Sequence, residues 1–204
     1  MTAPTDPAEY GWWLASRASG ITAFVLVACS VMLGLAMATK ILRGRVKPPV
    51  LVKLHEHLAL SGLVAIAVHA ITLLGDAWLD PGPLGVLVPF TMDHEPLFTG
   101  LGVIAAYLAA LLGLSYYARR RIGTKRWRGL HRLTLLVYVL AVAHTLGAGT
   151  DAATPWLRAI LIVTGAPILF LALLRLLPDV GSKAQPAQPA QAPAQSARPA
   201  EVTT

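Results

Sequence analysis

Residues 21–38 read ITAFVLVACSVMLGLAMA, a run without a single charged side chain. The hydrocarbon core of a bilayer is about 30 Å thick, and a helix needs about 20 apolar residues to cross it. No charged region precedes this run and no clean small-residue cleavage site accompanies it, so it does not fit a removable signal peptide. We therefore predict that it is a transmembrane helix, extending over residues 18–40.

Four further segments of this kind follow, and the composition of the chain agrees with them. They cover residues 54–75, 98–118, 131–149 and 155–177. Of the 204 residues, 55% are hydrophobic and 13% are charged, about half the charge of a soluble domain. A soluble fold of this size cannot hide so much apolar surface. We predict an all-α integral membrane protein, a bundle of five transmembrane helices. A disordered chain, a nucleic-acid-binding domain and an ordinary soluble enzyme are excluded.

The remaining stretches are not predicted to span the membrane. Residues 1–17 form an outer N-terminal segment, and residues 18–177 form the helical domain. Residues 178–204 are rich in Pro, Ala and Gln, which predicts a disordered cytoplasmic tail. Residues 80–96 contain four prolines and are too short to span a bilayer. We expect an outer loop there without helix, and leave open whether part of it re-enters the membrane.

The basic residues predict the orientation in the membrane. The chain carries 17 Lys and Arg against 10 Asp and Glu, a formal net charge of +7. Two short loops hold most of the cations, namely Lys40, Arg43, Arg45, Lys47, Lys53, Arg119, Arg120, Arg121, Lys125, Arg126, Arg128 and Arg132. Cytoplasmic loops are enriched in Lys and Arg. We therefore expect a multi-pass protein of the cell (plasma) membrane, with the N-terminus outside and the C-terminus cytoplasmic. Whether the basic loops also dock an acidic partner stays open.

Histidines are the unusual residues of the apolar segments. His55 and His69 stand at i and i+14 in the second segment, and His131 and His144 stand at i and i+13 in the fourth. At 1.5 Å per residue these spacings correspond to about 21 and about 19.5 Å. Both segments run from inside to outside, so His55 and His131 share one depth, and His69 and His144 share another. Ionisable residues inside a membrane are functional hypotheses by default. The pattern predicts two stacked haems (hemes), each held by two imidazoles.

The angles of the histidines about the helix axis support the prediction for the second segment and oppose it for the fourth. At about 100° per residue, His55 and His69 come within about 40° of sharing a face. The same arithmetic places His131 and His144 about 140° apart, so a local distortion of the helix is needed. His57, offset from His55 by about 200°, remains a rival to His55 as a ligand.

Other chemistries are less favoured by the residues. A transporter site would want carboxylates near the midplane, and a zinc ion would want ligands that converge on one point. The alternative left open is a haem-free membrane scaffold or transporter whose histidines pack or relay protons. The single cysteine, Cys29, excludes a disulfide framework and is predicted to be a packing residue. The outer loop with Asp93, His94 and Glu95 is a candidate acceptor site.

Three motifs carry a resemblance to a known family. SRASG at 16–20, LHEHLALSGLVAIAVH at 54–69 and RWRGLHRLTLLVYVLAVAHTLGAGTD at 126–151 resemble the ferric reductase-like transmembrane domain. The resemblance extends from about Trp13 to Leu177. It implies that His55 and His131 ligate an inner haem b (heme b), and that His69 and His144 ligate an outer one. Haem propionates need cationic partners, for which Arg132 is a candidate at the inner level and Arg17 at the outer level.

The resemblance also implies a function. It predicts transmembrane electron transfer by a cytochrome b-like oxidoreductase subunit, from a cytoplasmic flavoprotein or a membrane quinol to an acceptor outside. Many members of the family have six helices, and here the usual first helix is expected to be absent. No glycine-rich dinucleotide fingerprint occurs in the sequence, so the chain is expected to need a separate electron donor. The expected partners are the lipid bilayer, that donor and the outer acceptor, with no nucleic acid.

Overall fold

The computed structural model describes residues 7–176, and within them the chain is all-α without strands. The helices are α1 (Pro7–Ala38), α2 (Pro48–Leu73), α3 (Gly82–Leu87), α4 (Pro96–Ile122), α5 (Thr124–His131), α6 (Thr134–Ala148) and α7 (Pro155–Leu176). The predicted tail, 178–204, lies outside the described residues.

Five spans in the described chain are long and apolar enough to cross a membrane, which confirms the predicted fold class. Helices α1, α2, α4 and α7 each provide one span, and α5 with α6 provides the fourth in chain order. The long helices begin earlier than predicted: α1 starts at Pro7 and not at residue 18, and α2 starts at Pro48. Proline is favoured in the first turn of a helix, where its missing N–H has no partner to lose. The 32 residues of α1 extend about 48 Å, so this helix reaches beyond the hydrocarbon core.

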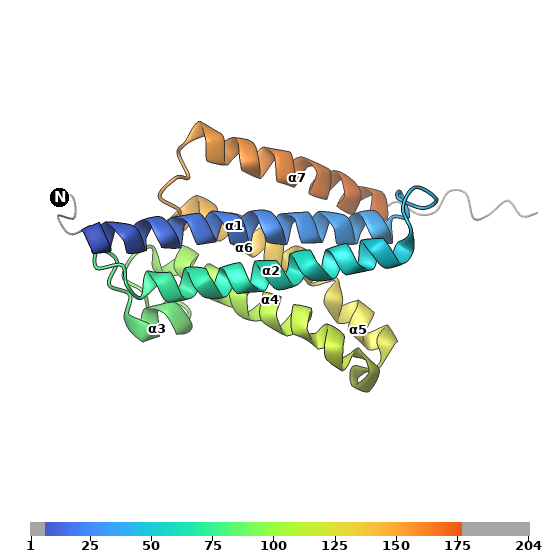
Figure 1. The fold of residues 1–204 in the computed structure, drawn as a ribbon, viewed down its shortest axis with the longest axis horizontal. Coiled ribbons are helices and arrows are strands. Elements are labelled where there is room, and N and C mark those ends of the chain that lie inside the picture. Colours follow the sequence, from blue (N-terminus) through green and yellow to red (C-terminus); the bar gives the residue numbers. More distant parts are fainter. Residues whose placement is uncertain (1–6, 177–204) are drawn as a thin grey trace, which may run out of the picture.

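The bundle is built from two antiparallel helix pairs and a covering helix (Figure 1). Helix α2 packs on α1, α6 packs on α4, and α7 packs on α1. The histidine-bearing helices α2 and α6 run in the same direction and belong to different pairs, so they face each other across the space between the pairs. Phe24 of α1, Tyr138 of α6 and Ile168 of α7 are buried together in the core. Outward side chains such as Leu111 and Val163 are 67% and 71% exposed, as expected for contact with lipid.

The prediction that residues 80–96 contain no helix is wrong. Gly82–Leu87 forms α3, and hydrogen bonds fix the loop around it. The Thr91 hydroxyl donates to the Leu84 carbonyl at 2.9 Å, and the Tyr107 hydroxyl of α4 donates to the Leu87 carbonyl at 2.6 Å. A proline in the first turn of so short a helix is tolerated, because no internal N–H bond is lost there.

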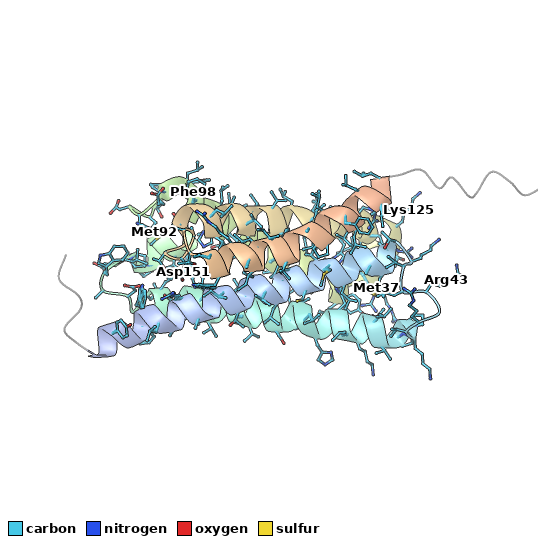
Figure 2. All side chains as sticks on the ribbon, turned by 90° about the horizontal axis from the view of Figure 1, so that it is seen from above. Met37, Arg43, Met92, Phe98, Lys125 and Asp151 are labelled. Carbon is cyan, nitrogen blue, oxygen red and sulfur yellow. The ribbon has the colours of Figure 1, made fainter. Side chains whose placement is uncertain are left out.

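The two ends of the bundle differ in charge, as Figure 2 shows. Arg43 and Lys125, which belong to the two basic loops, lie at one end, and Asp151 lies at the other. The structure thus brings the two basic loops to the same end of the bundle. The orientation of that end toward the cytoplasm stays a prediction.

Candidate functional site

Four histidines meet in two pairs between α2 and the α5–α6 span. The ring centres of His55 and His131 lie 6.0 Å apart, and those of His69 and His144 lie 6.4 Å apart. Each pair lines a cavity. We call the one with His55 and His131, nearer the basic loops, the inner cavity, and the one with His69 and His144 the outer cavity. Their volumes are about 550 and about 260 Å³. The structure therefore brings together the residues that were paired by depth.

Three of the four imidazoles are oriented by a backbone carbonyl. The Nδ1 atoms of His55, His69 and His144 lie 3.0, 2.8 and 2.9 Å from the carbonyl oxygens of Ser30, Ser16 and Phe98, in that order. A carbonyl only accepts, so Nδ1 carries the proton and Nε2 keeps its lone pair. Metal-bound histidines are held in the same way, with one nitrogen donating to a neighbour and the other free to bind.

A glycine exposes each of these carbonyls to the imidazole. Gly20, Gly34 and Gly102 stand one helical turn after Ser16, Ser30 and Phe98, at position i+4 in each case. The Cα–Cβ bond of a helical residue tilts toward the N-terminus, so a side chain at that position would stand over the carbonyl one turn before it. A Cβ on Gly20, Gly34 or Gly102 would lie 3.0, 3.3 or 2.5 Å from the facing histidine ring.

The glycines were missed by sequence reasoning, although a signal for them exists. Helix α1 contains a Ser with a Gly at i+4, once at 16–20 and again at 30–34. The second copy begins at i+14 relative to the first, which is the spacing of His55 and His69 on the antiparallel helix α2. A search for that same period on other helices would have found Gly20 and Gly34, but not Gly102, which has no repeat on α4.

The junction of α5 and α6 removes the rotational conflict noted in the sequence. Backbone N–H groups of Arg132, Leu133, Leu135 and Leu136 donate to carbonyls only three positions earlier. A helix wound in this way takes about 120° per residue and not about 100°. Between His131 and Leu136 the extra winding amounts to about 100°. It reduces the gap between His131 and His144 from about 140° to about 40°, the same offset as between His55 and His69. The distortion that the sequence required is present.

Two other histidines take different positions. The His57 side chain is exposed, and its Nδ1 lies 2.7 Å from the carbonyl of Lys53 on its own helix. It lines neither cavity, which favours His55 over His57 as the inner ligand. His94 is half-buried, lines the outer cavity and contacts the Trp78 ring, with ring centres 5.7 Å apart.

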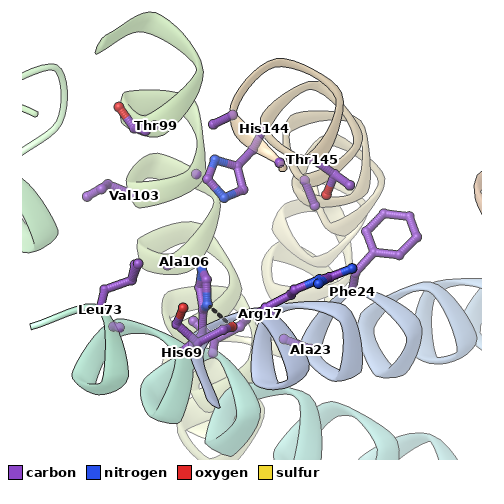
Figure 3. Close-up of a pocket in the computed structure, with 18 of the residues that line it drawn as sticks. Arg17, Ala23, Phe24, His69, Leu73, Thr99, Val103, Ala106, His144 and Thr145 are labelled. Atoms are coloured by element: carbon purple, nitrogen blue, oxygen red, sulfur yellow. Dashed lines mark hydrogen bonds between the residues drawn. The ribbon is translucent and has the colours of Figure 1, made fainter. Parts of the chain in front are cut away.

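The cationic candidates lie beside the cavities. Arg132 lines the inner cavity together with Arg128 and Arg175. Arg17 lines the outer cavity, but its guanidinium is bound by both carboxylate oxygens of Asp151. Figure 3 shows Arg17, His69 and His144 around this cavity. Nothing in the sequence indicates the Asp151 partner, which is 134 residues away. The assignment of both arginines to haem propionates stays a prediction.

We expect Arg17→Ala to lower the free energy of unfolding by roughly 2 kcal/mol, because it leaves the Asp151 carboxylate buried and unpaired. The loss stays below the full cost of breaking a buried pair since the Arg17 side chain is 32% exposed and that of Asp151 is 9% exposed. Thermal unfolding in detergent measures the change. Arg158→Ala, which removes an exposed arginine bound only to a backbone carbonyl, serves as the control. Equal melting temperatures for Arg17→Ala and Arg158→Ala would contradict the assignment.

The residues fit a haem better than a metal held by protein ligands alone. Within residues 7–176 no three His, Cys, Asp or Glu side chains gather as such a metal would need. Each cavity instead offers two facing imidazoles, the number that fills both axial positions of a haem iron. Metal–imidazole bonds are about 2 Å long, so rings with centres 6.0 and 6.4 Å apart can share one iron.

Comparisons with known proteins point the same way. The family model described as ferric reductase like transmembrane component matches residues 19–142, a range that includes His55, His69 and His131 and ends just before His144. The protein-methionine-sulfoxide reductase heme-binding subunit MsrQ of Salmonella arizonae is 28% identical over 123 residues. That alignment covers 59% of this chain and 48% of the relative, so the chain spans about half the length of this curated protein. No solved structure matches the chain.

Proposed function

The chain belongs to the ferric reductase-like transmembrane family, and on this premise we propose that it conducts electrons across the bilayer through two b-type haems. His55 and His131 would hold the inner haem, and His69 and His144 the outer one. The observation that carries the proposal is the presence of two facing imidazole pairs on the same two spans, with the α2 members at i and i+14.

A haem held by two imidazoles would supply one-electron chemistry. The chain's own residues supply orientation and a dry environment. The carbonyls of Ser16, Ser30 and Phe98 fix three imidazole rings before any ligand is bound. This removes part of the entropy cost of binding. Val27 and Val137 line both cavities, so apolar side chains form a shared wall between them and exclude water from it.

The direction of transfer rests on the charge distribution. The basic end of the bundle faces the cytoplasm under the positive-inside rule, so the inner site would receive electrons from a cytoplasmic flavoprotein or a membrane quinol. The outer site would pass them to an acceptor on the other side, in the plasma membrane of the cell. The name of the MsrQ relative suggests that a reductase of oxidised methionine residues is one such acceptor.

The decisive experiment is a reduced-minus-oxidised spectrum of the full chain purified in detergent from cells supplied with haem. We expect Soret and α bands of a b-type haem, and a pyridine haemochrome assay that gives two haems per chain. A protein that folds but shows no haem bands would leave the scaffold or transporter alternative in place and overturn the proposal.

Vesicles test whether electrons cross the bilayer by way of the outer pair. With a reductant trapped on the side of the basic loops, the wild type is expected to reduce ferricyanide added on the other side. The matched control is a chain in which His69 and His144 are both alanine. Equal rates in the two preparations would contradict transfer through the outer pair.

A further inference from the structure

His131 differs from the other three histidines in what surrounds its ring. Leu112 stands at i+14 relative to Phe98 on α4, and its carbonyl is near the His131 ring. The hydroxyl of Ser115, however, donates to that carbonyl at 2.7 Å. The buried Nδ1 atom of His131 makes no well-formed hydrogen bond with any residue in the described chain. The carbonyl anchor that holds the other rings is therefore missing here.

The glycine is missing as well. Tyr116 stands at i+4 relative to Leu112, at the position that Gly102 takes relative to Phe98. A residue with a side chain there covers the Leu112 carbonyl. Both features that let an imidazole reach a helix backbone at the other three positions are thus replaced at the fourth.

An aromatic cluster takes their place. The Trp127 ring is stacked on the His131 ring, with centres 4.9 Å apart and an angle of 26° between the planes. The indole Nε1–H of Trp127 donates to the Ser115 hydroxyl at 3.1 Å, and the Tyr116 ring lies 5.9 Å from the Trp127 ring. Residues that replace the anchor on α4 thus hold the indole against the imidazole.

We propose that Trp127 is the positioning residue of His131, and that stacking on its indole does for this imidazole what a backbone hydrogen bond does for the other three. The proposal rests on the proposed function, because it takes His131 as an axial ligand. A histidine whose second nitrogen donates a hydrogen bond is a stronger metal ligand than one whose second nitrogen does not. The inner site therefore contains one weaker imidazole, whose orientation depends on α5.

The test compares Trp127→Leu and Trp127→Phe in the full chain purified with its haem. Low-spin ferric haem signals in electron paramagnetic resonance are sensitive to the orientation of axial imidazoles, and redox titration gives the potential of each haem. The electron paramagnetic resonance signal of the inner haem, called the inner signal, is identified as the one that His131→Ala removes. Trp127→Leu is expected to shift or abolish the inner signal and to change the inner potential, with the outer signal unchanged. Trp127→Phe, which keeps a ring for stacking, is expected to retain the wild-type inner signal.

Two controls separate positioning from general packing. Trp156→Leu removes a tryptophan that lines neither cavity and is expected to leave both signals unchanged. Ser115→Ala removes the hydroxyl that accepts from the Trp127 indole. It is expected to shift the inner signal and the inner potential alone, because the indole is no longer held against the imidazole. If Trp127→Leu protein is too unstable to purify, the Ser115→Ala result decides.

The outcomes distinguish this proposal from the proposed function. Wild-type protein without haem overturns the proposed function. Wild-type protein with two haems, together with an unchanged inner signal and inner potential in Trp127→Leu, overturns the role of Trp127 alone. An unchanged inner potential in Ser115→Ala overturns it equally when Trp127→Leu cannot be purified.

Discussion

Purified His144→Ala protein is expected to carry one haem where the wild type carries two. The substitution removes one of two facing imidazoles of the outer cavity and leaves His69 without its partner at 6.4 Å. The inner pair lies about 20 Å away along the helices and keeps both rings. A pyridine haemochrome assay normalised to protein should therefore fall by about half, the share of one of two bis-imidazole sites. The bands that remain should be those of the inner haem.

The matched experiment at the inner cavity compares neighbouring histidines on α2. His55→Ala is expected to remove the inner haem, because the His55 ring faces His131 at 6.0 Å. His57→Ala is expected to keep both haems, because the His57 ring is exposed and bonded to its own helix. The reverse result, with a haem lost in His57→Ala and retained in His55→Ala, would show that the inner ligand is assigned to the wrong residue.

Addition of one methyl group at Gly102 is expected to weaken haem binding at the outer site without unfolding the bundle. The new Cβ would lie 2.5 Å from Nδ1 of His144, closer than real Cβ contacts allow, and it would stand over the Phe98 carbonyl that this nitrogen uses. Overpacking of this kind costs about 1–3 kcal/mol, which corresponds to roughly 5- to 150-fold weaker haem affinity. Titration of haem into the apoprotein measures the change.

The three cradle glycines, Gly20, Gly34 and Gly102, form a graded series. Their Cβ distances to the facing ring, 2.5 Å at Gly102, 3.0 Å at Gly20 and 3.3 Å at Gly34, predict the largest loss for Gly102→Ala and the smallest for Gly34→Ala. Gly129→Ala is the matched control, since a Cβ there meets nothing within 4 Å, and an alanine inside a helix is favoured over glycine by about 0.5–1 kcal/mol. Equal haem affinity in all four variants would overturn the role of the glycines.

The fold could be predicted from sequence because lipid imposes a simple requirement. Segments such as 21–38 must be helical and apolar along their whole length, since no water is present to satisfy an exposed backbone. The helix boundaries were less accessible, because α1 continues through polar residues to Pro7, outside the hydrocarbon core. Helix α3 was missed because so short a segment among prolines shows no helical periodicity of apolar residues.

The site could be predicted only in part, for reasons that can be named. Depth along a straight helix follows from counting residues, so His55 could be matched with His131. The angle about the helix axis between His131 and His144 could not be derived in this way. The tight turns at 129–136 change that angle, and they arise where α5 meets α6, without a sequence pattern of their own. The Arg17–Asp151 pair joins residues far apart in the chain, and a single sequence contains no record of that contact.

Helix α1 contributes no imidazole, yet it sets the distance between the two levels at which the α2 histidines are held. Its two Ser–Gly units, at 16–20 and 30–34, receive His69 and His55 at fixed points along the antiparallel helix. One residue more or fewer between Gly20 and Gly34 would turn one unit by about 100° and displace it by about 1.5 Å. The number of residues between the two units is therefore constrained, in addition to the buried side chains among them, such as Phe24 and Ala28. Helix α1 therefore requires a fixed number of residues between Gly20 and Gly34.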